Sequence, residues 1–422
     1  MSEIGGAPLL DPARVRELFD LRGGAFVFTG GGYEEDPYPC WARLRETGPV
    51  HEGTVHGLTD GFEGDALFHG LVEPNDHHFS VFSYAALDSV YRNDTIFASS
   101  PDATGPDLDN IGALSSMLTM GGERHRRYRT LVQPSFVPAK ARWWIANWIQ
   151  ETVDALVDNI LEQGGRSELN VDFCAAIPVL TITGSFGIPI DQALEIRAEL
   201  FANSNAVTEA VAPIIAARRE QPQDDLISVL VEAEVRDEDG QTHRLTDAEI
   251  NSFTMLLLTA GSGTTWKQMG ITLAALLQRP DVLAAVRADR ALLRNAVEES
   301  LRWQPTDPMF SRWVTEDTEL EGVTLPKGGV VHLCVGAANR DPARWDDPDT
   351  YDITRSPKPS FGFGGGPHVC LGMHVARAEM VTGINAVLDR LPNVRLDPDQ
   401  EPPRFIGLYE RGANEIHVTF DS

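Results

Sequence analysis

Hydrophobic residues recur at intervals of three and four along the middle of the chain, from about residue 140 to residue 300. The pattern is clearest in the segments ANWIQETVDALVDNILEQ and DVLAAVRADRALLRNAVEESLRW. Because this spacing places the apolar residues on one face of a helix, it predicts α-helices. Residues 1 to about 100 and the stretch from Thr306 to Arg355 instead contain turn-rich, β-branched segments. We therefore expect a mainly α fold with a minor β portion.

One helix is expected to be long. The residues Thr246-Asp247-Ala248-Glu249 have the spacing of a capping box, and an apolar helical pattern without proline follows to about Gln278. Such a helix would be ~50 Å long. Its middle reads AGSGTT, residues 260–265, and two glycines there cost ~1 kcal/mol each relative to alanine. Small residues would let a ligand approach the helix axis, and a hydroxyl can loosen the helix by bonding to a backbone carbonyl.

A glycine-rich loop near the C-terminus surrounds a single cysteine. Residues 361–372 read FGFGGGPHVCLG, and the glycines at 364–366 allow a tight turn. A helix expected from near Leu371 would direct its positive N-terminal end toward the Cys370 sulfur, and we expect this setting to favour a thiolate. A thiolate bound to heme iron favours O–O cleavage, whereas histidine ligation more often suits oxygen carriage. A lone cysteine is otherwise a small buried hydrophobe.

The spacing Phe363-x-x-Gly366-x-x-x-Cys370-x-Gly372 resembles the heme-binding signature of the cytochrome P-450 family of heme-thiolate monooxygenases. The resemblance implies one cytochrome P-450 domain over residues 1–422, in which residues 1–80 match loosely and residues 80–422 form the heme-binding body. Heme b would lie between the long central helix and the helix after the cysteine loop. Cys370 would bind the iron, and Phe363 would cover its sulfur.

By the same resemblance, the AGSGTT segment is an oxygen-binding groove. Thr264 would be the threonine that stabilises iron-bound dioxygen and helps to deliver protons, with Gly261, Gly263 and Thr265 beside it. Many family members carry an acidic residue just before this threonine, but this chain has Gly263. Protons must therefore arrive differently, through waters beside Gly263, a hydroxyl such as Ser262 or Thr265, or a substrate group. Farther along this helix, a lysine at position 267 is expected to face solvent or to form an ion pair.

Heme also carries two propionates, which need cationic or hydrogen-bonding partners when they are buried. The resemblance assigns this role to four residues: His125, Arg129, Arg312 and His368. It also matches Glu299 and Arg302 to the E-x-x-R pair, which would hold the scaffold together. At this spacing on a helix, a charged pair is otherwise usually a weak surface salt bridge.

The resemblance places the walls of a substrate pocket at residues 99–120, 306–310 and 406–409. The apolar residues there favour a terpenoid, steroid, fatty-acid or alkyl-aromatic substrate, and they are Met117, Leu118, Met120, Met309, Phe310, Ile406 and Leu408. The chain contains no G-x-G-x-x-G strand-to-helix fingerprint and no fused flavin domain. We therefore expect O2 as co-substrate and a separate ferredoxin-type electron donor with its NAD(P)H reductase.

Composition limits the partners and the compartment. The chain has 62 acidic and 35 basic residues, a formal net charge of -27, which disfavours nucleic acid and anionic lipid as partners. The N-terminus lacks a signal-peptide pattern, and no run approaches the ~20 apolar residues of a membrane anchor. The four cysteines have no paired spacing, which indicates neither a disulfide framework nor a zinc site. We expect a soluble cytoplasmic protein and, by resemblance, a bacterial one.

Two alternatives to a monooxygenase remain open from the sequence. The first is a peroxide-driven or non-oxygenating heme-thiolate enzyme, for which Gly263 leaves room. The second is a non-catalytic heme-binding or hydrophobe-binding protein that has lost its oxygen chemistry.

Overall fold

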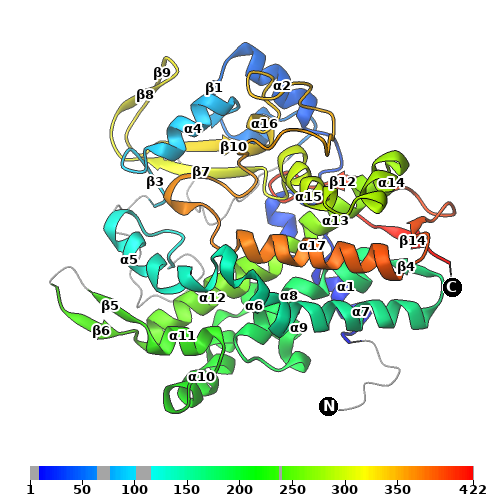
Figure 1. Cartoon of the computed structure of the whole chain (residues 1–422). Helices are drawn as coiled ribbons and strands as arrows, with labels where there is room; N and C mark the ends of the chain where they lie inside the picture. The colour runs from blue at the N-terminus through cyan, green and yellow to red at the C-terminus, as the bar shows by residue number, and fades with distance from the viewer. Residues whose placement is uncertain (1–8, 64–76, 101–115, 237–239, 422) are drawn as a thin grey trace.

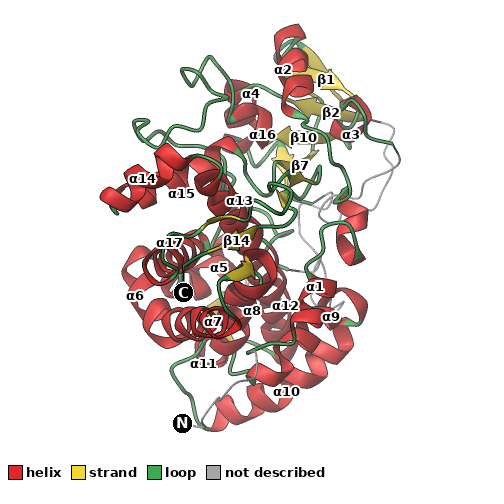
Figure 2. Ribbon diagram, turned by 90° about the vertical axis from the view of Figure 1, so that its right-hand side faces the viewer, coloured by secondary structure: helices red, strands yellow, loops and turns green. Residues whose placement is uncertain are grey.

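The computed structural model describes residues 9–63, 77–100, 116–236 and 240–421 of the 422-residue chain. Helices predominate, and a smaller group of strands lies toward one end of the molecule (Figures 1 and 2). The α-helices are α1 (Pro12–Leu18), α2 (Tyr38–Thr47), α3 (Val55–Leu58), α4 (Tyr84–Arg92), α5 (Gly122–Val132), α6 (Ala141–Trp144), α7 (Gln150–Gln163), α8 (Ala176–Ser185), α9 (Ala193–Ala202), α10 (Ser204–Glu220), α11 (Leu226–Glu232), α12 (Asp247–Gly263), α13 (Thr265–Leu277), α14 (Pro280–Ala288), α15 (Leu292–Trp303), α16 (Val335–Ala338) and α17 (Met373–Arg390).

The strands are short, and their bounds are β1 (Val50–Glu52), β2 (His78–Val81), β3 (Phe97–Ala98), β4 (Arg166–Glu168), β5 (Glu234–Arg236), β6 (Thr242–Arg244), β7 (Met309–Val314), β8 (Thr318–Leu320), β9 (Val323–Leu325), β10 (Val330–Cys334), β11 (Arg395–Leu396), β12 (Phe405–Ile406), β13 (Gly412–Ala413) and β14 (His417–Thr419). The expected mainly α fold with a minor β portion is confirmed. The helical pattern between residues 140 and 300 corresponds to α6 through α15, and among the described residues short π-helical and 3-10 turns, loops and the short strands β4 to β6 separate these helices.

The main sheet joins the two segments that the sequence marked as β-branched. Its strand order is β1-β2-β10-β7-β3, so β1 to β3 come from the first hundred residues and β7 and β10 from the second segment. β10 runs parallel to β2, and the other pairs are antiparallel. The first hundred residues also form α1 to α4, which their turn-rich pattern did not predict.

Both faces of this sheet are covered by helices. Val331 and Leu333 of β10 pack with Val90 of α4 on one side. Cys334 at the end of β10 packs with Trp41 of α2 on the other side. The sheet and its helices α2, α4 and α16 form the upper part of the molecule in Figure 1, and α17 crosses below them.

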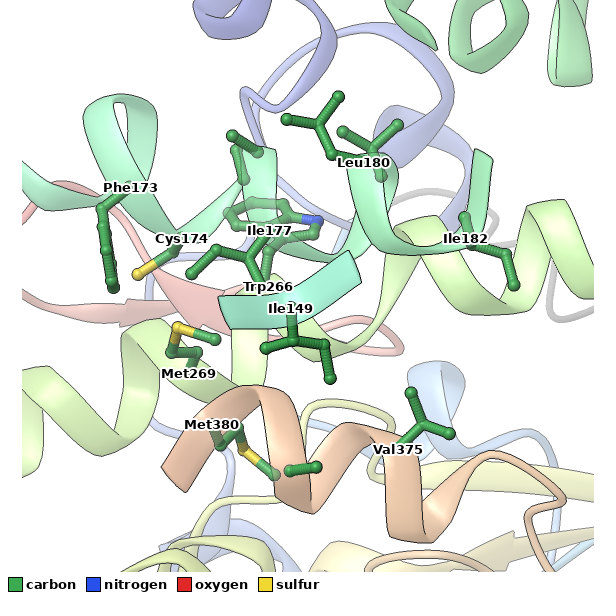
Figure 3. Close-up of a cluster of buried hydrophobic side chains, with 14 of the residues drawn as sticks. Ile149, Phe173, Cys174, Ile177, Leu180, Ile182, Trp266, Met269, Val375 and Met380 are labelled. Atoms are coloured by element: carbon green, nitrogen blue, oxygen red, sulfur yellow. The ribbon is translucent and has the colours of Figure 1, made fainter. Parts of the chain in front are cut away.

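A larger apolar core holds the helical part together and fixes the relative positions of α8, α13 and α17. Ile177 of α8, Trp266 and Met269 of α13, and Met380 of α17 meet in this core (Figure 3). Each is at most 1% exposed. Full burial of such a side chain contributes about 1.5–3 kcal/mol. The core therefore sets the position of the long central helix relative to the helix that follows the cysteine loop.

The long central helix is interrupted. The capping box between Thr246 and Glu249 is present, but α12 ends at Gly263 and α13 begins at Thr265. Thr264 lies between them with φ -102° and ψ -44°, and its hydroxyl donates to the carbonyl of Ala260 at 3.2 Å. The expectation of one continuous helix was wrong at this residue, where low helix propensity and a competing hydroxyl coincide.

In the part of the chain that the structure describes, no single helix is long and apolar enough to cross a membrane. Residues 247–277 and α14, taken together, have the length and apolar composition of a membrane span, but the chain bends by 102° between them. Buried core helices of soluble proteins can have the same length and composition.

Candidate active site

The cysteine loop is held in a tight conformation against α4. Gly364 and Gly366 have φ values of 69° and 65°, which L-residues with side chains rarely adopt. A Cβ added to Gly366 would lie 2.2 Å from the carbonyl oxygen of Tyr91. The backbone N–H of Cys370 donates to the carbonyl of Phe363 at 2.9 Å, which closes the loop. The expected tight turn is present, and α17 begins at Met373, two residues after the expected start.

Cys370 is the only one of the four cysteines, all of them in described residues, that is not buried. The dense surroundings of its sulfur nevertheless raise the pKa of the thiol to about 11, mainly through desolvation. The backbone N–H of Gly372 and the guanidinium groups of Arg129 and Arg377 lower this pKa, while Asp307 raises it. The expectation that the loop alone favours a thiolate was therefore wrong. Deprotonation must be driven by a cation at the sulfur, because metal binding releases the thiol proton.

The four residues that the sequence assigned to propionates are linked in space. The rings of His125 and His368 stack with centroids 3.9 Å apart. Arg129 donates from Nη2 to the carbonyl of Val369, the residue after His368, at 2.7 Å. Arg312 lies over the ring of Tyr91, with its guanidinium carbon 5.4 Å from the ring centroid.

This cluster is electrostatically unfavourable as it stands. Burial lowers the pKa of His125 to about 4, and the charge of Arg129 adds to the effect. Burial lowers the pKa of His368 to about 2, with contributions from His125, Arg312 and Arg129. His125 is 2% exposed, and neither of its ring nitrogens has a hydrogen-bond partner among the described residues. A buried imidazole without partners costs free energy, so the site favours a ligand that brings hydrogen-bond acceptors.

The residues present fit heme b. Its two carboxylates would supply the acceptors that His125 lacks and would offset the positive charge of Arg129 and Arg312. The partly exposed Cys370 would supply the sulfur ligand on the adjacent loop.

One face of α12 is left uncovered by protein. Ala260 is exposed, and Leu256 and Thr264, one turn before and after it, are partly exposed. Most other residues of this helix between Glu249 and Gly263 are buried. A stripe of accessible surface on a core helix borders a site for another molecule.

The other residues of the predicted oxygen groove face elsewhere, which corrects part of the assignment. A Cβ on Gly261 would lie 2.9 Å from the side chain of Ile182, so Gly261 allows close packing of α12 on α8. A Cβ on Gly263 would lie 3.8 Å from Nη2 of Arg197 on α9. Thr265 is buried beside Glu379 of α17.

Burial raises the pKa of Glu379 to about 8, although contacts with the hydroxyls of Thr181 and Thr265 oppose this rise. Glu379 is thus a carboxyl that holds its proton at neutral pH. It is buried beside Thr265, the residue after Thr264. The sequence did not single out Glu379. It lies two residues after Arg377 on a helix that contains both polar and apolar residues, and nothing in that pattern indicates that the carboxyl is buried.

Lys267 was expected either to face solvent or to form an ion pair. It forms an ion pair, and it is fully buried. Its ammonium group contacts Glu410 and lies 3.9 Å from Asp307. The ammonium group also lies 5.3 Å from the centroid of the Phe26 ring.

The predicted apolar pocket walls also need correction. Phe310 is only partly buried, and Leu118 is 46% exposed, but the other named residues present almost no surface. Residues 101–115 of the first predicted wall lie outside the described residues. The residues that pack into the protein core instead of lining a pocket are Met117, Met120, Met309, Ile406 and Leu408. Asp307, within the second predicted wall, and Glu410, directly after the third, remain partly exposed.

The E-x-x-R pair is buried, and Arg302 donates twice to Glu299 at 2.7 and 2.8 Å. Arg302 also donates to the carbonyls of Asn339, Pro348 and Thr350, which lie between the main sheet and the cysteine loop. The side chain of Asn339 in turn accepts the N–H of Phe361 at 2.8 Å. The pair is therefore connected to the cysteine loop.

Comparison with known proteins decides the family. A sequence profile described as Cytochrome P450 matches residues 189–409. The chain belongs to the cytochrome P-450 family. Among its relatives, the cytochrome P-450 monooxygenase PikC of Streptomyces venezuelae is 33% identical over 383 residues, 87% of each chain. The biotin biosynthesis cytochrome P-450 of Bacillus subtilis is 34% identical over 420 residues, covering 92% of this chain and 97% of the relative.

A solved structure gives the same result for the fold. The crystal structure of the cytochrome P-450 BioI, in complex with an acyl carrier protein ligated to hexadec-9Z-enoic acid, superposes with a TM-score of 0.74. It is 28% identical, and the match covers 92% of this chain and 98% of that one. This cytochrome P-450 is thus an oxidoreductase of the bacterial monooxygenase family, and its cofactor is heme b.

Proposed function

We propose that this cytochrome P-450 inserts one oxygen atom of O2 into a C–H bond of a hydrophobic small molecule, with electrons from a separate ferredoxin and its NAD(P)H reductase. The observation that carries the proposal is that the one accessible cysteine adjoins Arg129, which donates to the carbonyl of Val369, and the stacked rings of His125 and His368, where the nitrogens of His125 lack acceptors among the described residues. Bound there, heme supplies oxygen activation, and a thiolate ligand favours O–O cleavage. The whole chain would act as one cytochrome P-450 domain in the bacterial cytoplasm.

In this proposal each described residue has a limited task. Cys370 holds the iron, and Phe363, whose carbonyl fixes the Cys370 N–H, limits access of water to the sulfur. Gly366 and Gly372 shape the loop and the start of α17. His125 and His368, with the arginines at 129 and 312, hold the propionates.

Thr264 would pass protons at its hydroxyl, which lies on the uncovered face of α12. The neighbouring Ser262 is buried, and its hydroxyl donates to the carbonyl of Leu258 at 2.6 Å. This contact disfavours Ser262 as the source of protons. Thr265 is buried and does not lie on the uncovered face. Its hydroxyl contacts the protonated Glu379, which can store a proton.

The test begins with the holoprotein and a panel of steroids, terpenes, fatty acids and alkyl-aromatics, monitored through the low-spin to high-spin change of the ferric heme. The ligands that bind are then incubated with isotopically labelled O2, a bacterial ferredoxin and its NAD(P)H reductase. We expect one labelled oxygen atom in the product. Turnover with peroxide but none with the ferredoxin system would favour the peroxide-driven alternative, and absence of any oxygen consumption above background would favour a non-catalytic protein.

A further inference from the structure

A buried lysine connects two distant segments of the chain to the long central helix. Lys267 of α13 is 1% exposed, and its ammonium group contacts Glu410 and lies 3.9 Å from Asp307. Asp307 belongs to residues 304–307, between α15 and β7, and Glu410 belongs to residues 407–411, between β12 and β13. A charge buried in a protein is costly unless opposite charge accompanies it. The ammonium group therefore favours both acids, and the two segments with them, beside α13.

The residue after Lys267 holds one of these segments by a hydrogen bond. Gln268, which is 2% exposed, accepts the N–H of Thr306 through Oε1 at 2.9 Å. Thr306 is joined in turn to Arg411 of the other segment, because its Oγ1 donates to the Arg411 carbonyl at 2.8 Å and its own carbonyl accepts the Arg411 N–H at 2.7 Å. The two segments are thus one unit, attached to α13 at two consecutive residues, of which Lys267 supplies the charged contact.

This unit borders the heme site. Asp307 and Glu410 are partly exposed, in contrast to Lys267. The negative charge of Asp307 reaches the cysteine loop, since it raises the pKa of the Cys370 thiol. β7 begins two residues after Asp307 and carries Arg312, one of the residues assigned to the propionates. Displacing the unit would therefore change both the shape and the charge of the site.

We propose that Lys267 is a positioning residue of this site: it holds the two segments against the central helix and offsets the negative charge of their carboxylates. It lies three residues after Thr264, so the position of the segments is set relative to the uncovered face. Because Lys267 is itself buried, it acts on bound molecules only through Asp307 and Glu410. The inference rests on the heme site and not on oxygen insertion. A wild-type protein without oxygen insertion would refute the proposed function, while both measurements below would still decide the role of Lys267.

The first measurement is the reduction potential of the ligand-free heme in the holoprotein. Lys267→Met replaces the lysine with a neutral side chain of similar length and leaves the charge of the acids unbalanced. We expect its potential to shift to a more negative value, because nearby negative charge stabilises ferric over ferrous iron. Asp307→Asn should shift the potential in the opposite direction. The double variant Lys267→Met/Asp307→Asn should return close to the wild-type potential.

The second measurement tests the position of the segments with two ligands that bind ferric heme through a ring nitrogen. Imidazole is small, whereas 4-phenylimidazole also carries a phenyl ring that must fit beside the iron. Dissociation constants come from the shift of the Soret band. In Lys267→Met we expect 4-phenylimidazole to bind about 10-fold more weakly, while the affinity for imidazole changes by less than about 2-fold. Adding Asp307→Asn should not restore the affinity for 4-phenylimidazole, because it rebalances the charge without replacing the contacts of the ammonium group.

Arg218→Met is the matched control, since Arg218 pairs with Asp225 at 2.6 Å between α10 and the start of α11, and both side chains are largely buried. It should change neither the potential nor the ratio of the two dissociation constants. Absence of either expected change in Lys267→Met would overturn the proposal, as would equal changes in Arg218→Met. If Lys267→Met retains too little heme for measurement, Asp307→Asn decides alone: a more positive potential supports the proposal, and an unchanged or more negative one overturns it.

Discussion

The hydroxyl of Thr264 is the only side-chain hydroxyl of residues 260–265 on the uncovered face of α12, since Ser262 and Thr265 are both buried. Thr264→Ala should therefore weaken proton delivery and increase the peroxide released per NAD(P)H consumed. Thr264→Ser is the control, because it retains a hydroxyl and should remain closer to the wild type. The measurement is peroxide and product yield against NAD(P)H consumption. Unchanged coupling in Thr264→Ala would show that the threonine is not in the relay.

Glu379 makes stability depend on pH. Its folded-state pKa, about 8, lies above the value of about 4.5 expected when the chain is unfolded. The folded protein therefore binds an extra proton between these values, and the stability that this group contributes is lost as pH rises from about 4.5 to about 8. Glu379→Gln, which stays neutral, should gain stability relative to the wild type as pH rises.

The effect should reach on the order of 3 kcal/mol near pH 8 and nearly vanish near pH 5. Urea unfolding of the two holoproteins at both pH values measures it. A stability difference that is the same at both pH values would contradict the raised pKa.

At the residue scale, the sequence singled out Cys370 by a motif with fixed spacing, and the structure places His125 against His368 and Arg129 against the carbonyl of Val369. Their roles toward heme stay predictions. The sequence was not sufficient for Arg197, which lies in the segment ALEIRAELFA and looks like a member of an amphipathic surface helix. Its burial depends on the packing of α9 against α12, which local sequence does not encode. The same holds for Lys267, whose partners come from residues 307 and 410.

At the element scale, the cysteine loop depends on backbone conformations that only glycine adopts easily. Gly366→Ala would place a methyl group 2.2 Å from the carbonyl oxygen of Tyr91 at a φ of 65°. We expect a loss of about 2–4 kcal/mol in the free energy of unfolding, together with weaker heme retention. Denaturant unfolding and the heme-to-protein absorbance ratio measure the two effects.

Gly32→Ala provides the comparison for this loop variant. Gly32 is exposed, has no atom within 4 Å of an added Cβ, and has no positive φ. Its substitution should change stability by less than ~0.5 kcal/mol. If Gly366→Ala also changed the free energy of unfolding by less than ~0.5 kcal/mol, the loop could not approach α4 as closely as described.

Element boundaries were predicted less well than element types. Periodicity located the central helix from its capping box at Thr246, but it could not show the break at Thr264, since the residues on both sides keep the same apolar pattern. Turn-rich composition in the first hundred residues concealed α1 to α4. These helices are stabilised by contacts with distant parts of the chain, such as Trp41 of α2 with the end of β10.

At the scale of the whole molecule, the buried Arg302 connects α15 to the segment between the main sheet and the cysteine loop. Arg302→Lys would lose the bidentate contact with Glu299 and several bonds to backbone carbonyls. Because it leaves a buried carboxylate poorly paired, we expect a loss of about 3–5 kcal/mol in unfolding free energy.

Arg290→Lys is the control for that substitution, since Arg290 pairs with Asp389 at the surface. Its effect should stay below ~1 kcal/mol. Urea unfolding of both variants provides the comparison, and similar small effects would mean that the Glu299–Arg302 pair does not hold the scaffold together.

The mainly α fold followed from periodicity alone, whereas the arrangement of the main sheet did not. Its strands come from segments more than two hundred residues apart, with β10 lying between β2 and β7. No local pattern specifies such pairing. The resemblance carried by the cysteine loop supplied the architecture, and the match to the cytochrome P-450 family confirmed it.

The most direct test of the central claim is the absorption spectrum of the ferrous carbon monoxide complex in the wild type and in Cys370→Ser. Cys40→Ser serves as control, because Cys40 is a buried cysteine of α2 whose thiol donates to the carbonyl of Leu58. We predict a red-shifted Soret band, characteristic of thiolate ligation, in the wild type and in Cys40→Ser, and its loss in Cys370→Ser. Retention of that band in Cys370→Ser would contradict the assignment of the iron ligand and, with it, the proposed active site.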